Sequence, residues 1–313
     1  MSRSRGAAGV ALRLLFSVAV FLVAGEVTLR VVYRDAGRRT PFGPGFQAFE
    51  HLTTADGRRG RFDTGPKTPG VPRILAIGDS ITYGQGVRRW EDVWPERLVQ
   101  QLVGAGHPHQ LALVADLGFN IADHARSLDA NLGPVQPDIL IYQWFYNDVQ
   151  DEDAVEPDLR TWWRRLPWHE RLRGSYLYYG LDYQLWRLSP VQRRYQDYIQ
   201  RDLGPGSRQG RAFEAAFAVM AARARREVPQ RWVLLYPQLP YRGAYPLQGL
   251  HDWVAALARR EGFGVVDPTA QLNTFNTHAS WFDGHPNEQA HMVLAGAMAE
   301  ALLASPLLQW REP

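Results

Sequence analysis

The sequence lacks cysteine altogether and has a single lysine, Lys67, among its 313 residues. Without cysteine there is no thiol catalysis, no disulfide bond and no thiolate metal site. Almost all of the positive charge belongs to arginine, whose guanidinium keeps its proton, so lysine chemistry such as a Schiff base is excluded in practice. The formal net charge is only +3 and the basic residues are scattered. We therefore expect no nucleic-acid partner.

Apolar residues, in contrast, are plentiful at 45% of the chain, which is enough for a substantial core in one large domain or two small ones. Their first concentration is at the N-terminus, where residues 14–25 are apolar and uncharged and Arg13 lies just before them. We assign residues 1–33 to a signal or anchor segment that engages a membrane. Val23 and Gly25 are small residues before a candidate cleavage point.

Three interpretations of this segment stay open. An uncleaved anchor fits because Arg13 can extend its side chain to the cytoplasmic surface of the membrane. A cleaved signal peptide fits the length of the apolar stretch, and a buried helix of a cytosolic protein has similar composition. In the first two cases the rest of the chain is membrane-anchored or secreted and lies outside the cytoplasm, in the periplasm or at the cell surface.

After a Gly- and Pro-rich linker or extended arm at residues 34–71, apolar runs and helical spacings alternate. Such alternation predicts a parallel sheet with helices on both faces. We assign residues 72–305 to this α/β domain, with an aromatic-rich insertion at 150–212. The predicted strands are 72–77, 111–117, 138–144, 232–236 and 264–266, and the predicted helices are 94–103, 121–132, 213–226, 247–260 and 288–303.

Several chemically capable residues follow the predicted strands. Ser80 follows the first strand, Gly118 the second and Asn147 the third, while His285 precedes the last helix. In a flavodoxin-like parallel sheet of order 2-1-3-4-5, these loops meet at the carboxyl edge of the sheet. Asp283 lies two residues before His285.

Acyl transfer needs a nucleophile, a base and donors for an oxyanion. Ser80 is the expected nucleophile, His285 its base, and Asp283 the carboxylate that orients the imidazole. We expect the backbone N–H groups of Ser80 and Gly118, with the side-chain amide of Asn147, to form the oxyanion hole.

These residues lie in segments that resemble the SGNH/GDSL hydrolase family of serine esterases and acyl hydrolases. Gly-Asp-Ser-Ile-Thr-Tyr-Gly at 78–84 is similar to its nucleophile block, Gly118 to its glycine block, Asn-Asp at 147–148 to its asparagine block, and Asp-Gly-His-Pro-Asn at 283–287 to its histidine block. The resemblance covers about residues 72–149 and 213–303. It implies a three-layer α/β/α sandwich with a shallow active site, no metal and no cofactor.

Two positions depart from the family pattern. Phe145 stands where the family often has glycine, which predicts a crowded site or a narrower acyl pocket. The family usually places its aspartate three residues before the histidine, where this chain has Phe282. The role of Asp283 therefore depends on a shorter spacing.

The leading hypothesis is an ester hydrolase that removes a short acyl group from a small-molecule or glycan ester, on a carbohydrate or other polar carrier. The same residues suit an O-acyltransferase in which a sugar hydroxyl replaces water. A catalytically silent binding module of the same fold is a third hypothesis, and a lipase or thioesterase for long acyl chains a fourth. A metal site at His291 and Glu288 is not expected, because no His-Glu-x-x-His motif is present.

The insertion at 150–212 combines many tryptophans and tyrosines with arginines. It follows the asparagine block, so one hypothesis is a cap over the active site whose aromatic rings stack on sugars and whose arginines meet anionic groups or a membrane surface. The alternative is that these aromatic residues only pack the insertion onto the domain.

Overall fold

The computed structural model describes residues 2–32, 59–62, 67–85, 87, 89–150, 160–239, 241, 243–272, 277–280 and 283–305. Contacts divide the chain into two compact units, the first made of residues 1–49 and 160–191 and the second of residues 50–159 and 192–313. The second unit contains the sheet and is called the sheet unit below. The predicted boundaries of the N-terminal segment, the arm and the insertion stay predictions.

The sheet unit is built on a sheet of order β1-β3-β2-β4-β5-β6. Five strands are parallel, and β1 pairs antiparallel with β3 at one edge. Without β1, the order along the chain is 2-1-3-4-5, so the predicted flavodoxin-like topology is confirmed. The strands are β1 (Arg59–Phe62), β2 (Arg73–Gly78), β3 (Gln110–Ala115), β4 (Ile139–Trp144), β5 (Gln230–Leu235) and β6 (Gly264–Val266).

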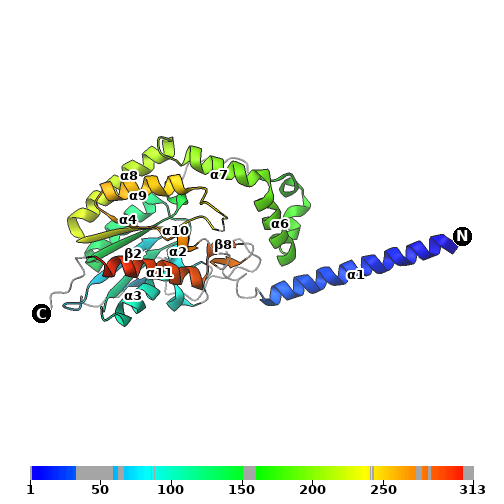
Figure 1. Ribbon diagram of the computed structural model, residues 1–313, viewed down its shortest axis with the longest axis horizontal. Coiled ribbons are helices and arrows are strands. Elements are labelled where there is room, and N and C mark those ends of the chain that lie inside the picture. Colours follow the sequence, from blue (N-terminus) through cyan, green and yellow to red (C-terminus); the bar gives the residue numbers. More distant parts are fainter. Residues whose placement is uncertain are drawn as a thin grey trace. The chain divides into compact units, whose positions relative to one another are not determined.

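Helices cover both faces of this sheet, as Figure 1 shows. Side chains alternate along each strand, so Leu75 and Ile77 join one apolar cluster while Ile74 and Ala76 join the other. The first cluster contains residues of α4, α8 and α9, and the second contains residues of α3 and α11. The three-layer α/β/α prediction is therefore confirmed. These helices are α3 (Trp94–Gly104), α4 (Ile121–Val135), α8 (Arg208–Glu227), α9 (Gln248–Arg260) and α11 (Glu288–Leu303).

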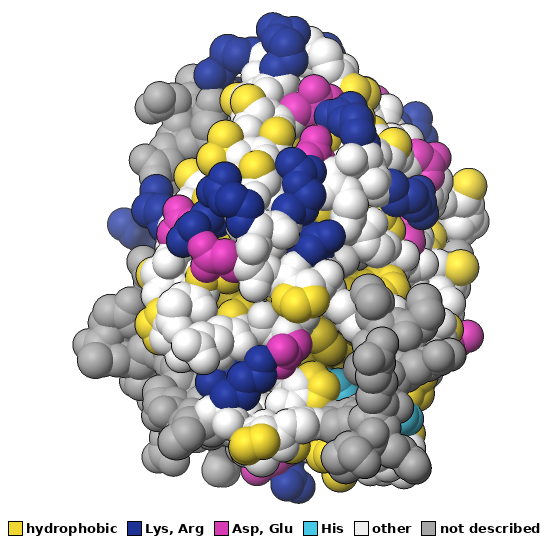
Figure 2. Space-filling view, turned by 90° about the vertical axis from the view of Figure 1, so that its left-hand side faces the viewer, with side chains coloured by type: hydrophobic (Ala, Val, Ile, Leu, Met, Phe, Trp, Pro, Cys, Tyr) yellow, Lys and Arg dark blue, Asp and Glu magenta, His cyan; other side chains and the backbone are white. Residues whose placement is uncertain are grey.

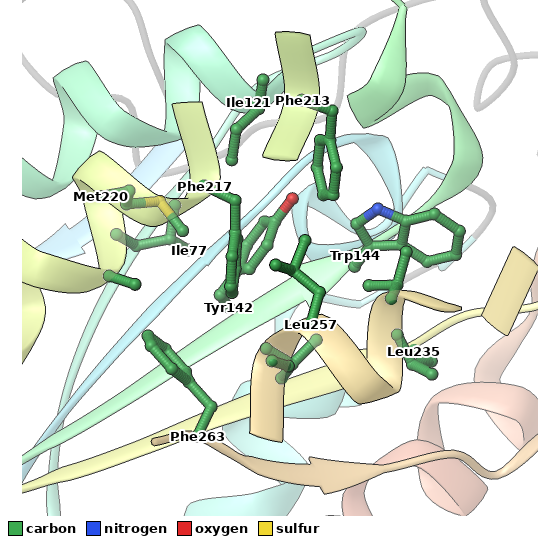
Figure 3. Packing of buried hydrophobic residues seen from close by; sticks show 14 of the residues in the cluster. Ile77, Ile121, Tyr142, Trp144, Phe213, Phe217, Met220, Leu235, Leu257 and Phe263 are labelled. Atoms are coloured by element: carbon green, nitrogen blue, oxygen red, sulfur yellow. The ribbon is translucent and has the colours of Figure 1, made fainter. Parts of the chain in front are cut away.

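Large aromatic side chains fill the layer between the sheet and α8. Figure 3 shows Tyr142 and Trp144 of β4 facing Phe213 and Phe217 of α8. The rings of Tyr142 and Phe217 are 6.1 Å apart, and all four side chains are at most 1% exposed. Burying side chains of this size contributes about 2–3 kcal/mol each to the hydrophobic term. This packing holds β4 rigidly, and β4 leads directly to Asn147.

The other elements of the sheet unit connect these strands and helices. A short hairpin of β7 and β8 stands outside the main sheet, and neither it nor the edge strand β1 was predicted from the sequence. The short elements are α2 (Ser80–Tyr83), η1 (Trp90–Asp92), η2 (Tyr146–Val149), α10 (Thr269–Leu272), β7 (His278–Ser280) and β8 (Asp283–Pro286). The 13-residue helix α7 (Pro190–Asp202) begins with two residues of the first unit.

One side of the sheet unit carries mixed charges. Figure 2 shows lysine and arginine side chains interspersed there with acidic ones. Elsewhere among the described residues, Arg223 of α8 lies 3.1 Å from Asp129 of α4, and Arg225 lies 2.5 Å from Glu261. Surface ion pairs contribute little to stability, but such acidic partners offset part of the arginine charge.

The first unit contains α1 (Ser2–Val32), η3 (Trp162–Arg165), α5 (Trp168–Leu172) and α6 (Tyr176–Leu188). Residues Gly9–Val31 are the one stretch among the described helices that is long and apolar enough to cross a membrane. None of that stretch is buried inside the protein. Signal anchors and signal peptides share this property.

Candidate active site

The structure brings Ser80 and His285 together across more than 200 residues of chain. Ser80 Oγ lies 3.1 Å from Nε2 of His285. Ser80 is the first residue of α2, directly after the central strand β2, and His285 belongs to β8. The serine is 9% exposed and the histidine is half-buried. A hydroxyl at this distance from a ring nitrogen is the arrangement in which a histidine can activate a serine.

The turn that carries Ser80 is fixed by its neighbours in sequence. Asp79 precedes the helix, and its Oδ1 accepts a hydrogen bond of 2.9 Å from the backbone N of Ile81. Gly84 ends the helix with a φ of 81°, a left-handed conformation that favours glycine. The single helical turn is therefore capped at both ends, which holds Ser80 at the end of the strand.

Below this turn, the backbone passes close to buried polar side chains. A Cβ atom at Gly78 would overlap the Thr82 hydroxyl and the Gln143 side chain. Gln143 Oε1 accepts hydrogen bonds from Thr82 Oγ1 at 2.9 Å and from the backbone N of Asp79 at 3.3 Å. Glycine at position 78 thus permits the close approach that links the Ser80 turn to β4.

The loops after β3 and β4 are also joined. Asn147 Nδ2 donates a 3.3 Å hydrogen bond to the carbonyl oxygen of Phe119, which follows Gly118. Gly118 is exposed and has a φ of 72°, a conformation that most other residues avoid. The glycine and asparagine loops predicted to lie near each other are neighbours in the structure.

A buried polar cluster behind the site was not predicted. Asp148 accepts hydrogen bonds from the Tyr142 hydroxyl at 2.7 Å and the Phe145 backbone N at 3.1 Å, and Nε2 of His124 lies 3.0 Å from its other oxygen. Burial, and then repulsion from Asp148, raises the pKa of Asp79 to about 6. Burial likewise raises the pKa of the Tyr142 hydroxyl well above its usual range.

His124 lies on the inner face of an amphipathic helix, and the sequence alone offers no sign of its partner. The one available signal for this cluster is the run Tyr-Gln-Trp at 142–144, where polar groups occur inside an otherwise apolar buried strand. Buried polar groups need partners, so that pattern could have indicated a polar network beneath the site.

Two other residues singled out in the sequence, Asp283 and His291, lie on β8 and α11. The backbone of Asp283 lies in β8, where it pairs with Ser280, but its side chain is outside the described residues. His291 accepts a 2.9 Å hydrogen bond at Nδ1 from the backbone N of Trp94, which ties α11 to α3. In the described part of the chain, no group of three or more His, Asp or Glu side chains is arranged to hold a metal ion.

A parallel sheet of this order, with a capped serine after its first parallel strand and a histidine before its last helix, defines an SGNH-type carboxylic ester hydrolase. The chain belongs to the GDSL-like lipase/acylhydrolase family, whose sequence model matches residues 76–293. The general activity of the chain is therefore ester hydrolysis.

Several solved structures are similar to this chain at low sequence identity. TesA is 18% identical, with 75% of this chain and 99% of TesA covered and a TM-score of 0.49. A catalytic mutant of Axe2, an acetylxylan esterase from Geobacillus stearothermophilus, is 17% identical over 73% of this chain and 93% of that one, with a TM-score of 0.45. LAE5, from the metagenome of Lake Arreo, Spain, is 18% identical over 75% of this chain and 97% of its own, also with a TM-score of 0.45. No curated protein matches the sequence.

Proposed function

We propose that the chain hydrolyses esters through a covalent acyl-enzyme on Ser80. The observation that carries this proposal is the 3.1 Å separation of Ser80 Oγ from His285 Nε2. His285 accepts the serine proton as Oγ attacks the ester carbonyl carbon, and then gives that proton to the departing alkoxide. A water molecule, deprotonated by the same nitrogen, attacks the acyl-enzyme, releases the acid and restores Ser80.

Negative charge that develops on the carbonyl oxygen needs donors fixed in advance. In our proposal these are the backbone N–H groups of Ser80 and Gly118 and the Nδ2 of Asn147. The hydrogen bond from Asn147 to Phe119 supports this role, because it uses one N–H of the amide and leaves the second N–H for substrate.

Asp283 is the proposed carboxylate partner of His285. Its place in β8, two residues before the histidine, supports this assignment. Its role would be to fix the imidazole tautomer that leaves Nε2 unprotonated, and to stabilise the imidazolium formed during attack.

The proposed substrate is a short acyl ester on a carbohydrate or another polar carrier. The support is Phe145, a half-buried ring two residues before Asn147. It packs against Tyr236 at 5.7 Å and against the cluster that includes Ile81, next to the nucleophile. A phenylalanine where relatives often have glycine reduces the volume available to an acyl chain. The apolar helix α1 supports a location outside the cytoplasm, at a membrane.

A fluorophosphonate probe tests the proposed nucleophile directly. We expect one labelled peptide, containing Ser80, and loss of labelling in Ser80→Ala and His285→Ala. Ser189→Ala, which removes a serine of the first unit, is the control and should label normally. A wild-type chain that is folded but unlabelled would refute the mechanism and favour a silent binding module.

Hydrolase and acyltransferase differ only in the acceptor. The acyl donor is therefore incubated with and without a glycan acceptor, and both free acid and acylated glycan are quantified. We expect free acid at similar rates in both reactions. Acylated glycan as the main product would replace the hydrolase with an O-acyltransferase that uses the same residues.

A further inference from the structure

Glu26, near the end of α1, makes specific contacts with the start of α6. Its carboxylate accepts hydrogen bonds from the Ser175 hydroxyl at 2.7 Å, the Tyr176 backbone N at 3.1 Å and the Leu177 backbone N at 2.9 Å. A negative charge at the first turn of a 13-residue helix also suits the helix dipole. Glu26 therefore acts as a cap for α6 from a distant part of the chain.

Arg30, one turn later on α1, reinforces the same junction. Its Nε lies 2.7 Å from Glu26, its Nη2 donates a 2.9 Å hydrogen bond to the carbonyl oxygen of Gly174, and its guanidinium lies 5.3 Å from the centre of the Tyr176 ring. Cleavage after Gly25 would make Glu26 the first residue and remove the helical turn that holds it. The junction therefore requires an intact α1.

One side of α6 is covered within the same unit. Asp182 is buried and pairs with Arg164 at 2.8 Å, and it also accepts a 2.7 Å hydrogen bond from Trp163 Nε1. The Tyr178 hydroxyl lies 2.7 Å from Nδ1 of His169. This side of α6 thus packs on η3 and α5 through satisfied polar contacts.

A second side of α6 is apolar and begins at α1. Leu177 lies beside Gly25, and the following leucines at one-turn intervals, Leu181, Leu185 and Leu188, are all exposed. Helix geometry places these four leucines within about 80° of one another. An apolar stripe on a helix is normally buried, and this stripe continues from a helix whose own surface is apolar and exposed.

The rest of the unit has the composition of a bilayer interface. Trp162, Trp168 and Leu172 are exposed, as are several arginines: Arg165, Arg171 and Arg173. Tryptophan favours the boundary between acyl chains and headgroups, and arginine binds anionic headgroups. The uncharged helix from Arg13 to Glu26 is about 20 Å long, against about 30 Å for the hydrocarbon layer of a bilayer. The long Arg13 side chain can extend toward the inner headgroups and makes up part of this difference, which leaves Glu26 in the outer part of the membrane.

We propose that α1 is retained in the mature protein and that residues 160–191, held to it by Glu26, rest on the outer surface of the lipid bilayer with the leucine stripe of α6 in contact with acyl chains. This inference rests on the membrane location in the proposed function but not on the ester chemistry. It gives part of the aromatic-rich insertion a lipid ligand instead of a sugar.

The test uses the full chain in phosphatidylcholine and phosphatidylglycerol vesicles that contain lipids with brominated acyl chains. Because the chain has no cysteine, Leu185→Cys carries a single bimane label. Val219→Cys is the matched control, since Val219 is 71% exposed and Leu185 54% but Val219 lies on α8 of the sheet unit. We expect brominated lipid to quench the label at position 185 at least about twofold more than the label at 219.

Four outcomes would overturn the proposal. Equal, weak quenching at both positions excludes lipid contact. Disulfide cross-linking between unlabelled Leu185→Cys chains, with no quenching in the labelled protein, indicates a second copy on the stripe. Shielding of the label by a covalent active-site inhibitor, again without quenching, indicates a cap over the site. An intact mass that lacks the first 25 residues also refutes retention of α1.

Glu26 is tested separately in the Leu185→Cys background. Glu26→Ala should reduce lipid quenching toward the control level, Glu26→Gln should retain part of it because an amide oxygen still accepts hydrogen bonds, and Glu170→Ala, at an exposed carboxylate of the same unit, should have no effect. Unchanged quenching in Glu26→Ala would refute its role. Fluorophosphonate labelling of Ser80 reports on the esterase proposal independently, so the two proposals can fail separately.

Discussion

The two residues that meet in the site come from regions built in different ways. Ser80 follows a central strand whose six residues are all buried, and its turn is linked by hydrogen bonds to the neighbouring strand. His285 lies on a four-residue strand of a hairpin outside the sheet, directly before the Asn287 cap of α11. Ser80 is therefore positioned by the core, and His285 by a short hairpin and one helix cap.

Substitutions in the two regions are therefore expected to differ in their effects on folding and on activity. Changes beside Ser80 disturb buried polar groups and are expected to affect folding as well as activity. Changes beside His285 act on the alignment of one imidazole and are expected to affect activity with less cost in stability. The predictions below test this contrast, from the largest expected effect to the smallest.

The largest effect is expected when either reacting group is removed. Ser80→Ala and His285→Ala should each reduce kcat/KM by up to about a millionfold, and the double variant should be scarcely worse than either single one, because the two groups act as a unit. Rates of ester hydrolysis for the three variants check this. A loss in the double variant equal to the product of the two single losses, or substantial activity in Ser80→Ala, would refute a shared mechanism.

On the histidine side, Asp283→Asn should reduce kcat by about ten-thousandfold, by analogy with other serine hydrolases, because the amide favours the wrong imidazole tautomer. The urea midpoint should change little, since the hairpin stands apart from the sheet. A loss of less than tenfold would show that Asp283 does not orient His285.

Asn147→Ala should lower kcat by about a hundredfold to a thousandfold and leave KM nearly unchanged, because an oxyanion donor binds charge that exists only in the transition state. Steady-state kinetics on one chromogenic ester separates the two constants. A raised KM with unchanged kcat would instead make Asn147 a substrate-binding residue.

On the serine side, the buried Asp79 predicts a pH effect on stability. Its pKa rises from 3.8 to about 6 on folding, so the folded state holds this proton more tightly than the unfolded state. The tighter binding of this proton adds about 3 kcal/mol to the free energy of unfolding below pH 4, and this contribution is lost as the pH rises through 6. Asp79→Asn should therefore become more stable relative to wild type as the pH rises from 4 to 7.

Urea denaturation across this pH range checks the prediction. The amide oxygen of Asp79→Asn can still cap the Ile81 backbone N. Asp129→Asn, at a largely exposed carboxylate, is the control and should run parallel to wild type. A constant difference between Asp79→Asn and wild type at all pH values would contradict the raised pKa.

The contrast between the two regions also explains how much the sequence predicted. The sheet, its order and its five flanking helices were predicted because their apolar residues repeat with the periods of strands and helices. Ser80 and His285 were predicted from short motifs, and their side chains lie 3.1 Å apart in the structure. The β7–β8 hairpin was not, because three- and four-residue strands leave no periodic signal.

The polar cluster behind Ser80 was missed for a different reason. His124 and Asp148 lie far apart in sequence, and only the folded chain brings their side chains to 3.0 Å. The junction of Glu26 with Ser175 was missed for the same reason: a carboxylate near the end of an apolar helix gives no indication of which distant helix it caps. Long-range pairs of polar residues are what a single sequence reveals least.

The smallest effect is expected at Phe145, which belongs to the serine side but lines the proposed acyl pocket. Phe145→Ala should raise the ratio of kcat/KM for a hexanoate ester to that for an acetate ester by about tenfold, because removing the ring makes room for methylene groups, each contributing about 0.8 kcal/mol when buried. Removing a half-buried ring is expected to reduce the amount of folded protein and with it the absolute rates. The ratio of two rate constants measured on the same preparation is unaffected by that loss.

Trp253→Ala is the matched control, because Trp253 is a half-buried aromatic residue of α9 that packs on Phe213 at 5.6 Å. It should lower stability and leave the ratio unchanged. If Phe145→Ala also leaves the ratio unchanged, the ring does not limit acyl length, and the preference for short acyl groups loses its structural basis.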